Sequence, residues 1–150
     1  MGIKPINILL VEDNEGDIVL LMEAFGDAKI VNRIDIARDG AEAINFLNGL
    51  ADTNLSDLPD LILLDINLPK KNGYEVISSI KSNSLLAEIP VIILTTSSSE
   101  MEIIKTKNLE AYCYIIKPSE IDEYVKVVRK IEDHWTSTLE LQKLKHNGKG

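Results

Sequence analysis

Five short runs of apolar residues recur along the chain, each of them rich in Ile, Leu and Val. Three of these runs are continuously apolar, a pattern typical of strands that are covered on both faces of a parallel sheet. The expected strands are Ile6–Val11, Arg33–Ala37, Leu61–Leu64, Val91–Leu94 and Tyr112–Ile116.

Segments with helical spacing follow these runs, because their apolar residues recur three and four positions apart. The expected helices begin near Asn14, Ala41, Tyr74, Ser97 and Ser119. Gly49 is expected to end the second helix, and the polar stretch Leu50–Pro59 to form a loop before the third strand. Ser97 and Glu100 match the capping-box pattern at the start of the fourth helix.

Strands and helices therefore alternate five times along the chain. This order predicts an α/β fold of the doubly wound, flavodoxin-like (βα)5 type, with a five-stranded parallel sheet and helices on both faces. Ligands bind to such folds at the carboxyl ends of the strands. Functional side chains are expected there.

The composition is that of a globular protein, with 150 residues, 45% hydrophobic and 27% charged, and its length favours one domain. The formal net charge of -8 without clustered cations argues against nucleic-acid binding. Cys113 is the only cysteine, which excludes an internal disulfide, and its apolar neighbours favour a buried structural thiol. The sequence shows no signal peptide and no apolar stretch near the ~20 residues of a membrane span, so we expect a cytoplasmic protein with no membrane contact.

Polar residues follow the apolar runs at the edge where a ligand is expected. They are Glu12 and Asp13 after the first run, Asp65 after the third, Thr95 after the fourth and Lys117 after the fifth. Carboxylates that meet ~4 Å apart repel by roughly 4 kcal/mol per pair at an effective dielectric constant near 20. A cation in addition to Lys117 is therefore expected, and Mg2+ fits because it binds through one or two carboxylates and keeps several waters.

This set of residues resembles the signature of response-regulator receiver domains. The spacing from Asp65 to Thr95 and on to Lys117 agrees with that family, as does the segment Asp65–Pro69 with Gly73 closing the loop. The resemblance extends over essentially the whole chain, from about Ile6 to Ile131. It implies a phosphoacceptor of a two-component His-Asp phosphorelay, which signals through protein contacts and is not an enzyme in the metabolic sense.

The resemblance also implies roles for single residues. Asp65 would accept the phosphoryl group from a sensor histidine kinase. Glu12 and Asp13 would hold Mg2+ directly or through water, together with Asp65 itself and the backbone carbonyl of Asn67. In addition, Lys117 would pair with the phosphoryl oxygens and Thr95 would hydrogen-bond to them.

Two further residues would belong to the switch. Tyr114 would turn inward when Thr95 moves, and Pro118 resembles the cis proline with which the family orients Lys117. The sequence departs from many receivers before the fifth strand, where Asn108–Ala111 stands in place of a glycine. That departure leaves the shape of the turn after the fourth helix undefined.

The segments Ile116–Ser119 and Val127–Trp135 are similar to the small regulators that pair with bacterial phytochrome kinases, and the loop expected before the third strand fits that subgroup. The expected partner is therefore a sensor histidine kinase of the phytochrome type. A receiver that serves a different kinase is the alternative within the family.

An aspartyl-phosphate phosphatase of the haloacid-dehalogenase type is the alternative from another class. Such enzymes use Asp-x-Asp-x-Thr at the nucleophile, whereas this chain reads Asp65-Ile-Asn-Leu-Pro and lacks the second carboxylate. A flavodoxin-like binding module would need a Gly-rich phosphate loop after the first strand, which is absent. Each residue alone, such as Thr95 or Tyr114, also fits an ordinary structural role, so their joint occurrence carries the interpretation.

The last helix carries an apolar stripe, formed by Ile121, Tyr124, Val125, Val128, Ile131, Trp135 and Leu139. The domain core should use this stripe to about Ile131 and leave Trp135 and Leu139 for a partner surface. Ordinary packing of Trp135 and Leu139 against the domain itself is the alternative. Together with the resemblance, this predicts a homodimer formed through the fourth helix, the fifth strand and the last helix. The predicted division is a receiver domain, residues 1–137, and a C-terminal extension, residues 138–150, partly helical and then frayed from Lys145.

Overall fold

The computed structural model describes residues 6–28, 32–68, 70–106, 111 and 113–148, and only the backbone of Asn32, Thr106 and residues 136–148. In chain order the elements are β1 (Ile6–Val11), α1 (Glu15–Gly26), β2 (Asn32–Ala37), α2 (Gly40–Thr53), the 3-10 helix η1 (Leu55–Asp57), β3 (Leu61–Asp65), α3 (Gly73–Ser82), β4 (Val91–Thr95), α4 (Ser98–Thr106), β5 (Cys113–Ile116) and α5 (Ile121–Gly148). The predicted alternation of strands and helices is confirmed. Tyr112, expected to begin the fifth strand, lies outside the described residues.

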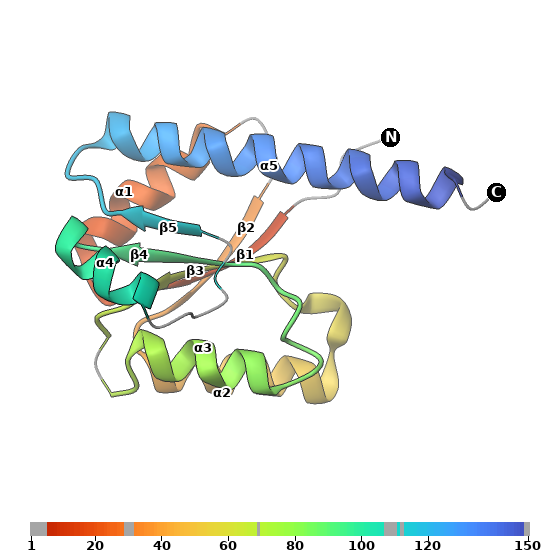
Figure 1. Cartoon of the computed structure of the whole chain (residues 1–150), viewed down its shortest axis with the longest axis horizontal. Helices are drawn as coiled ribbons and strands as arrows, with labels where there is room; N and C mark the ends of the chain where they lie inside the picture. Colours follow the sequence, from red (N-terminus) through yellow and green to blue (C-terminus); the bar gives the residue numbers. More distant parts are fainter. Residues whose placement is uncertain (1–5, 29–31, 69, 107–110, 112, 149–150) are drawn as a thin grey trace.

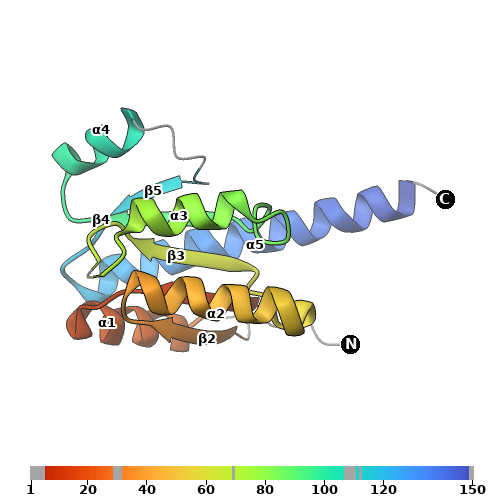
Figure 2. The ribbon, with the colours of Figure 1, turned by 90° about the horizontal axis from the view of Figure 1, so that it is seen from below.

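The strands form one parallel sheet in the order β2-β1-β3-β4-β5. This is the strand order of flavodoxin-like folds, so the predicted fold class is confirmed. Helices α1 and α5 cover one face, and α2 and α3 lie against the other (Figure 1). Figure 2, turned by 90° and seen from below, shows α2 and α3 side by side in front of the sheet and α4 set apart near β4 and β5.

Buried strands supply side chains to two separate cores, as the continuously apolar runs predict. Along β3, Leu61 and Leu63 join the core beneath α1 and α5, whereas Ile62 and Leu64 join the core beneath α2 and α3. Alternation arises because successive side chains of a strand point to opposite faces. The sheet therefore lies between two apolar layers.

Helix α2 continues past Gly49 to Thr53, so the prediction that it ends at Gly49 is wrong. The reason is packing: Ala43, Leu47 and Ala51 recur four residues apart and are all buried, while Gly49 lies on the exposed side. The predicted loop Leu50–Pro59 consequently contains the last turn of α2 and the short helix η1.

Helix α5 runs for 28 residues and its final turns extend beyond the sheet (Figure 1). Ile131 is buried, and the partly buried Trp135 packs against the same core, so the core uses the stripe one turn further than predicted. The backbone stays helical through Lys145, where the sequence predicts fraying, and the side chain of Leu139 lies outside the described part. Among the described residues, no helix combines the length and the apolar character needed to cross a bilayer.

Candidate functional site

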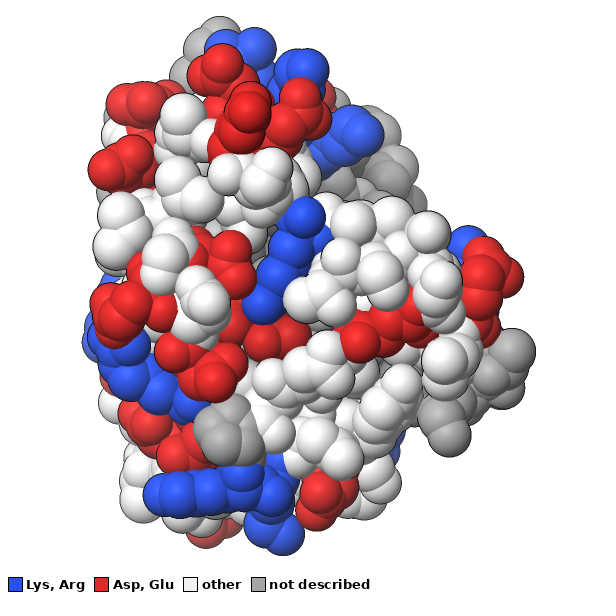
Figure 3. All heavy atoms as spheres, turned by 90° about the vertical axis from the view of Figure 1, so that its left-hand side faces the viewer, with Lys and Arg blue, Asp and Glu red and all other residues white. Residues whose placement is uncertain are grey.

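The carboxyl ends of β1, β3, β4 and β5 bring the predicted residues to one edge of the sheet. Parallel register places Asp65 beside Leu94, and Thr95 beside Ile116, immediately before Lys117. The backbone N–H of Lys117 donates to the carbonyl of Thr95 at 2.7 Å, which fixes the start of the loop after β5. On this face acidic side chains surround a basic one near the middle of the view (Figure 3).

Three carboxylates converge at this edge as predicted. Glu12, Asp13 and Asp65 each offer an oxygen, and these oxygens all lie within 4.8 Å of one another. Glu12 and Asp65 are buried, with 0% and 2% exposure, while Asp13 is exposed at the opening. Clustered carboxylate oxygens are the ligands that hard divalent cations prefer, so the cluster suits a divalent metal ion.

The ammonium group of Lys117 lies among three carboxylates. The Nζ atom is 2.6 Å from Glu12 Oε1, 3.1 Å from Asp65 Oδ2 and 3.2 Å from Asp17 Oδ2. The Glu12 carboxylate is held in place from the other side, where its Oε2 accepts the backbone N–H groups of Asp13 and Asn14. The lysine is thus aimed directly at the predicted phosphoacceptor.

Burial and neighbouring groups shift the pKa values of Glu12 and Lys117. Burial, followed by the hydrogen bond and the charge of Asp65, raises the pKa of Glu12 to about 8, although Lys117 works in the opposite direction. Burial would lower the pKa of Lys117, but hydrogen bonds and attraction from Glu12 and Asp65 outweigh it and hold that pKa above its usual value. Lys117 therefore stays charged, and Glu12 keeps its proton to a higher pH than an exposed glutamate does.

The resemblance implies a cis peptide bond before Pro118, and the structure differs from this expectation. No peptide bond in the described part of the chain is cis, and the Lys117–Pro118 bond is trans. The trans isomer is the intrinsically favoured one, by roughly 0.5–1 kcal/mol for a bond before proline. Lys117 reaches all three carboxylates with this bond trans, so a cis proline is not what orients it here.

Asp17 and Tyr124 belong to the site, and neither was predicted as a site residue. Asp17 accepts from Lys117 through Oδ2 and from the Tyr124 hydroxyl through Oδ1 at 3.0 Å. Burial and this hydrogen bond raise the pKa of Tyr124. The sequence offers one signal, the position of Asp17 in the first helical turn after Asp13, but Tyr124 reads only as part of an apolar stripe.

Thr95 is fully buried, and its hydroxyl donates to Glu100 Oε1. The other oxygen of Glu100 accepts from the side-chain amide of Asn67 at 2.7 Å. Burial works to raise the pKa of Glu100, but the hydrogen bonds from Thr95 and Asn67 outweigh it and hold that pKa below its usual value. The backbone N–H of Asn67 donates to Asp65 Oδ1 at 3.1 Å, so the predicted Asn67 lies beside the carboxylate cluster.

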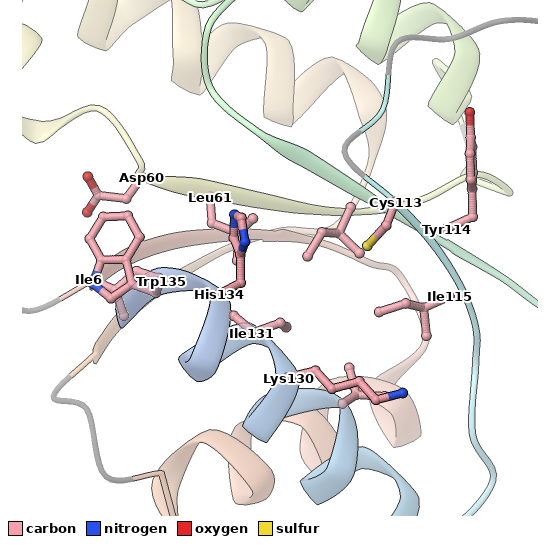
Figure 4. Close-up of a pocket in the computed structure, with 12 residues that line it drawn as sticks. Ile6, Asp60, Leu61, Cys113, Tyr114, Ile115, Lys130, Ile131, His134 and Trp135 are labelled. Atoms are coloured by element: carbon pink, nitrogen blue, oxygen red, sulfur yellow. The ribbon is translucent and has the colours of Figure 1, made fainter. Parts of the chain in front are cut away.

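Tyr114 is partly buried and packs against the core beneath α2 and α3. The side chains of Tyr114 and Ile115 point to opposite sides of β5 (Figure 4). A mostly apolar cavity of about 360 Å³ lies beside α5 and is lined among others by Cys113, Ile131 and Trp135. Figure 4 shows these lining side chains. Burial raises the pKa of the Cys113 thiol, which agrees with a structural role.

Comparisons with known proteins agree with this geometry. The family model described as the response regulator receiver domain matches residues 8–129. Response regulator Rcp1 of a Synechocystis species is 42% identical over 137 residues, covering 91% of this chain and 93% of the relative. The probable methanogenesis regulatory protein FilR2 of Methanothrix harundinacea is 38% identical over 131 residues, covering 87% and 84%.

Solved structures give the same result. The phosphorylated cyanobacterial phytochrome response regulator RcpA matches with a TM-score of 0.78 at 41% identity, over 90% of this chain and 96% of that one. The Mn2+-bound form of response regulator Rcp1 matches with a TM-score of 0.74 at 42% identity, over 87% and 94%. With its family match, its phytochrome-associated relatives and its charged edge, this chain belongs to the response-regulator receiver family and fits the phosphoacceptor function of two-component signalling.

Proposed function

We propose that Asp65 is the phosphoacceptor and that the chain takes its phosphoryl group from the histidine of a sensor kinase. The observation that carries this proposal is the environment of the Asp65 carboxylate. Asp65 Oδ2 lies 3.1 Å from Lys117 Nζ, and oxygens of Asp65, Glu12 and Asp13 lie within 4.8 Å of one another. No other group of three or more His, Cys, Asp or Glu side chains has metal-binding geometry among the residues that the structure describes.

The transfer follows from the placement of these groups. One oxygen of Asp65 forms a bond to phosphorus while the P–N bond to the kinase histidine breaks, and the departing imidazole keeps the electron pair and takes up a proton. Lys117 already points at Asp65 and offsets charge on the phosphoryl oxygens. Hydrolysis of the resulting acyl phosphate by water returns phosphate and the free carboxylate, so the chain is a switch and not a metabolic enzyme.

The metal in this proposal is Mg2+, held by Glu12, Asp13 and Asp65 with the backbone carbonyl of Asn67. All four supply oxygen, which is the donor set that Mg2+ takes together with water and phosphate. The ion would neutralise negative charge so that a dianionic phosphoryl group can approach a carboxylate. The relative Rcp1, solved with Mn2+, supports a divalent ion in this family.

The proposed partner is a histidine kinase of the phytochrome type, because Rcp1 and RcpA are similar to this chain over nearly its whole length. A receiver for a different kinase is the alternative, and FilR2, named for methanogenesis regulation, keeps it open. We further propose a cytoplasmic homodimer, built from a receiver domain of residues 1–137 and an extension of residues 138–150. Ile103 on α4 and Ile116 on β5 are both exposed and support contact through this side.

The proposal is tested by phosphorylation of purified protein with acetyl phosphate and Mg2+, read by intact mass. The parent chain should gain one phosphoryl group, and Asp65→Asn should gain none because an amide is a poor nucleophile. Asp57→Asn, which removes the same charge from the remote helix η1, serves as the matched control and should be labelled like the parent. Chelation of the metal should stop labelling of the parent.

Normal labelling of Asp65→Asn would refute the assignment of Asp65. Labelling that persists after chelation would show that the acidic cluster has a structural role only. Transfer from a phytochrome kinase compared with unrelated sensor kinases then separates the two alternatives for the partner.

A further inference from the structure

Glu100 joins the two loops that follow β3 and β4. It lies in the first turn of α4, and its Oε1 accepts from the Thr95 hydroxyl and from the backbone N–H of Thr96 at 3.4 Å. Its Oε2 accepts from Asn67 Nδ2 at 2.7 Å. The sequence predicts only a helix cap at this position, so these contacts add a role that capping does not explain.

Capping of α4 does not use the Glu100 carboxylate. The backbone N–H of Glu100 donates to Ser97 Oγ at 3.1 Å, which is one half of a capping box. In the complete motif the glutamate side chain would turn back to the N–H of the capping residue. Here the carboxylate instead accepts from Thr95, Thr96 and Asn67, which places it next to the proposed phosphorylation site.

A hydroxyl group has a single hydrogen to donate. While the Thr95 hydroxyl donates to Glu100, it cannot donate to a phosphoryl oxygen on Asp65. The negative charge of Glu100 also opposes a phosphoryl group that brings about two further negative charges. Glu100 therefore competes with the phosphoryl group for the same donor.

We propose that Glu100 is a positioning residue that holds the Thr95 hydroxyl away from Asp65 in the unphosphorylated chain and so limits phosphoryl binding. The proposal rests on the proposed function of Asp65. After phosphorylation the Thr95 hydroxyl donates to the phosphoryl group, and its hydrogen bond to Glu100 is lost. Because Glu100 lies in the first turn of α4, loss of this contact allows that turn to move. Phosphorylation of Asp65 therefore changes the surface of α4.

The test is the affinity for beryllofluoride, a phosphoryl mimic, measured by calorimetric titration in the presence of Mg2+. Glu100→Gln should bind about three- to tenfold more tightly than the parent, because the competing acceptor is weakened and its charge removed. Glu100→Ala removes the competing acceptor altogether and should also bind beryllofluoride more tightly than the parent. Glu102→Gln is the matched control, since it removes one charge from the exposed side of the same helix, where Glu102 pairs with Lys105, and it should bind like the parent.

A double-mutant cycle with Thr95→Val separates competition for the hydroxyl from a general effect of charge. Without the hydroxyl, Glu100→Gln should raise the affinity clearly less than in the parent background, because only the effect of its charge remains. An equal gain in both backgrounds, a gain with Glu102→Gln as large as with Glu100→Gln, or weaker binding by the Glu100 variants would overturn the proposal. Failure of the parent to bind beryllofluoride, or labelling of Asp65→Asn, would instead contradict the function proposed for Asp65.

Discussion

Lys117 neutralises only part of the charge that surrounds it. Its single ammonium group lies within 3.2 Å of oxygens from Glu12, Asp65 and Asp17. Asp13 adds a fourth carboxylate at the exposed opening. Taken as ionised, these four carboxylates carry more negative charge than Lys117 offsets, and a divalent ion would offset the rest. Burial is the main cause of the raised pKa of Glu12, and the hydrogen bond and charge of Asp65 add to it.

The pKa of Glu12 makes a prediction for stability in the absence of metal. Its folded-state pKa of about 8 exceeds the ordinary value of 4.5, so the folded chain binds this proton more tightly than the unfolded chain. The resulting stabilisation is complete below the ordinary value and is lost as pH rises toward 8. We expect the free energy of unfolding in a chelator, measured with urea, to fall by up to about 3 kcal/mol between about pH 5 and 8.

Glu12→Gln is the control for this pH dependence, because the amide does not titrate. Its stability should decline less over the same range. Saturating Mg2+ should also flatten the parent curve, since a bound cation favours the ionised carboxylate. An equally steep decline in Glu12→Gln would show that another group is responsible.

At the scale of single elements, α2 illustrates how packing and conformational preference oppose one another. The helix contains a buried glycine at its start, Gly40, and an exposed glycine in its interior, Gly49. A Cβ added to Gly40 would lie 1.7 Å from the backbone carbonyl oxygen of Lys71, whereas one added to Gly49 would meet no atom within 4 Å. Lys71 lies between Asp65 and α3, so Gly40 sets the position of the loop beside the phosphoacceptor.

Replacing each glycine by alanine should therefore have opposite effects. Gly49→Ala should raise the free energy of unfolding by about 0.5–1 kcal/mol, because glycine is a poor former of helix interiors. Gly40→Ala should lower it by about 1–3 kcal/mol, because the backbone of the neighbouring loop must move. Urea unfolding of the two variants beside the parent measures both, and a change of the same sign in both would contradict this account of α2.

The whole molecule leaves apolar side chains exposed on the side that we propose for dimerisation. Ile103 on α4 is 55% exposed and Ile116 on β5 is 43% exposed. Trp135, predicted to reach a partner, instead packs against the core of its own domain, and its Nε1 has no hydrogen-bond partner among the described residues. Truncation of Trp135 should therefore affect the stability of the domain, and the exposed isoleucines are the better probes of assembly.

If the homodimer forms through this side, the double substitution Ile103→Ser/Ile116→Ser should weaken self-association. Each isoleucine occurs twice in a symmetric interface, and burial of each is worth roughly 1.5–3 kcal/mol, so the dissociation constant should rise by about a hundredfold or more. Leu55→Ser/Leu85→Ser is the matched control, with side chains 53% and 51% exposed on η1 and after α3. Sedimentation velocity over a range of concentrations measures both, and equal association of the two variants would place the interface elsewhere.

The fold and the main charged residues could be predicted from the sequence, and the reason is topological. Continuous apolar runs separated by amphipathic segments specify a parallel sheet, and a parallel sheet brings all its carboxyl ends to one edge. Asp65 and Lys117 are 52 positions apart, yet they meet because each follows a strand. Glu12 and Asp13 also follow a strand and Thr95 ends one, so their place at this edge could be predicted as well.

The tertiary structure alone decided which side chains complete this edge. Asp17 accepts hydrogen bonds from Lys117, 100 positions away in the sequence, and from Tyr124, 107 positions away. Such pairs depend on how α1 and α5 pack together. Packing also carried α2 past Gly49, because burial of Ala51 outweighs the local preference of an exposed glycine. A periodic pattern specifies which face of an element is buried, but the partner of a polar side chain on that element is set only when the elements are brought into contact.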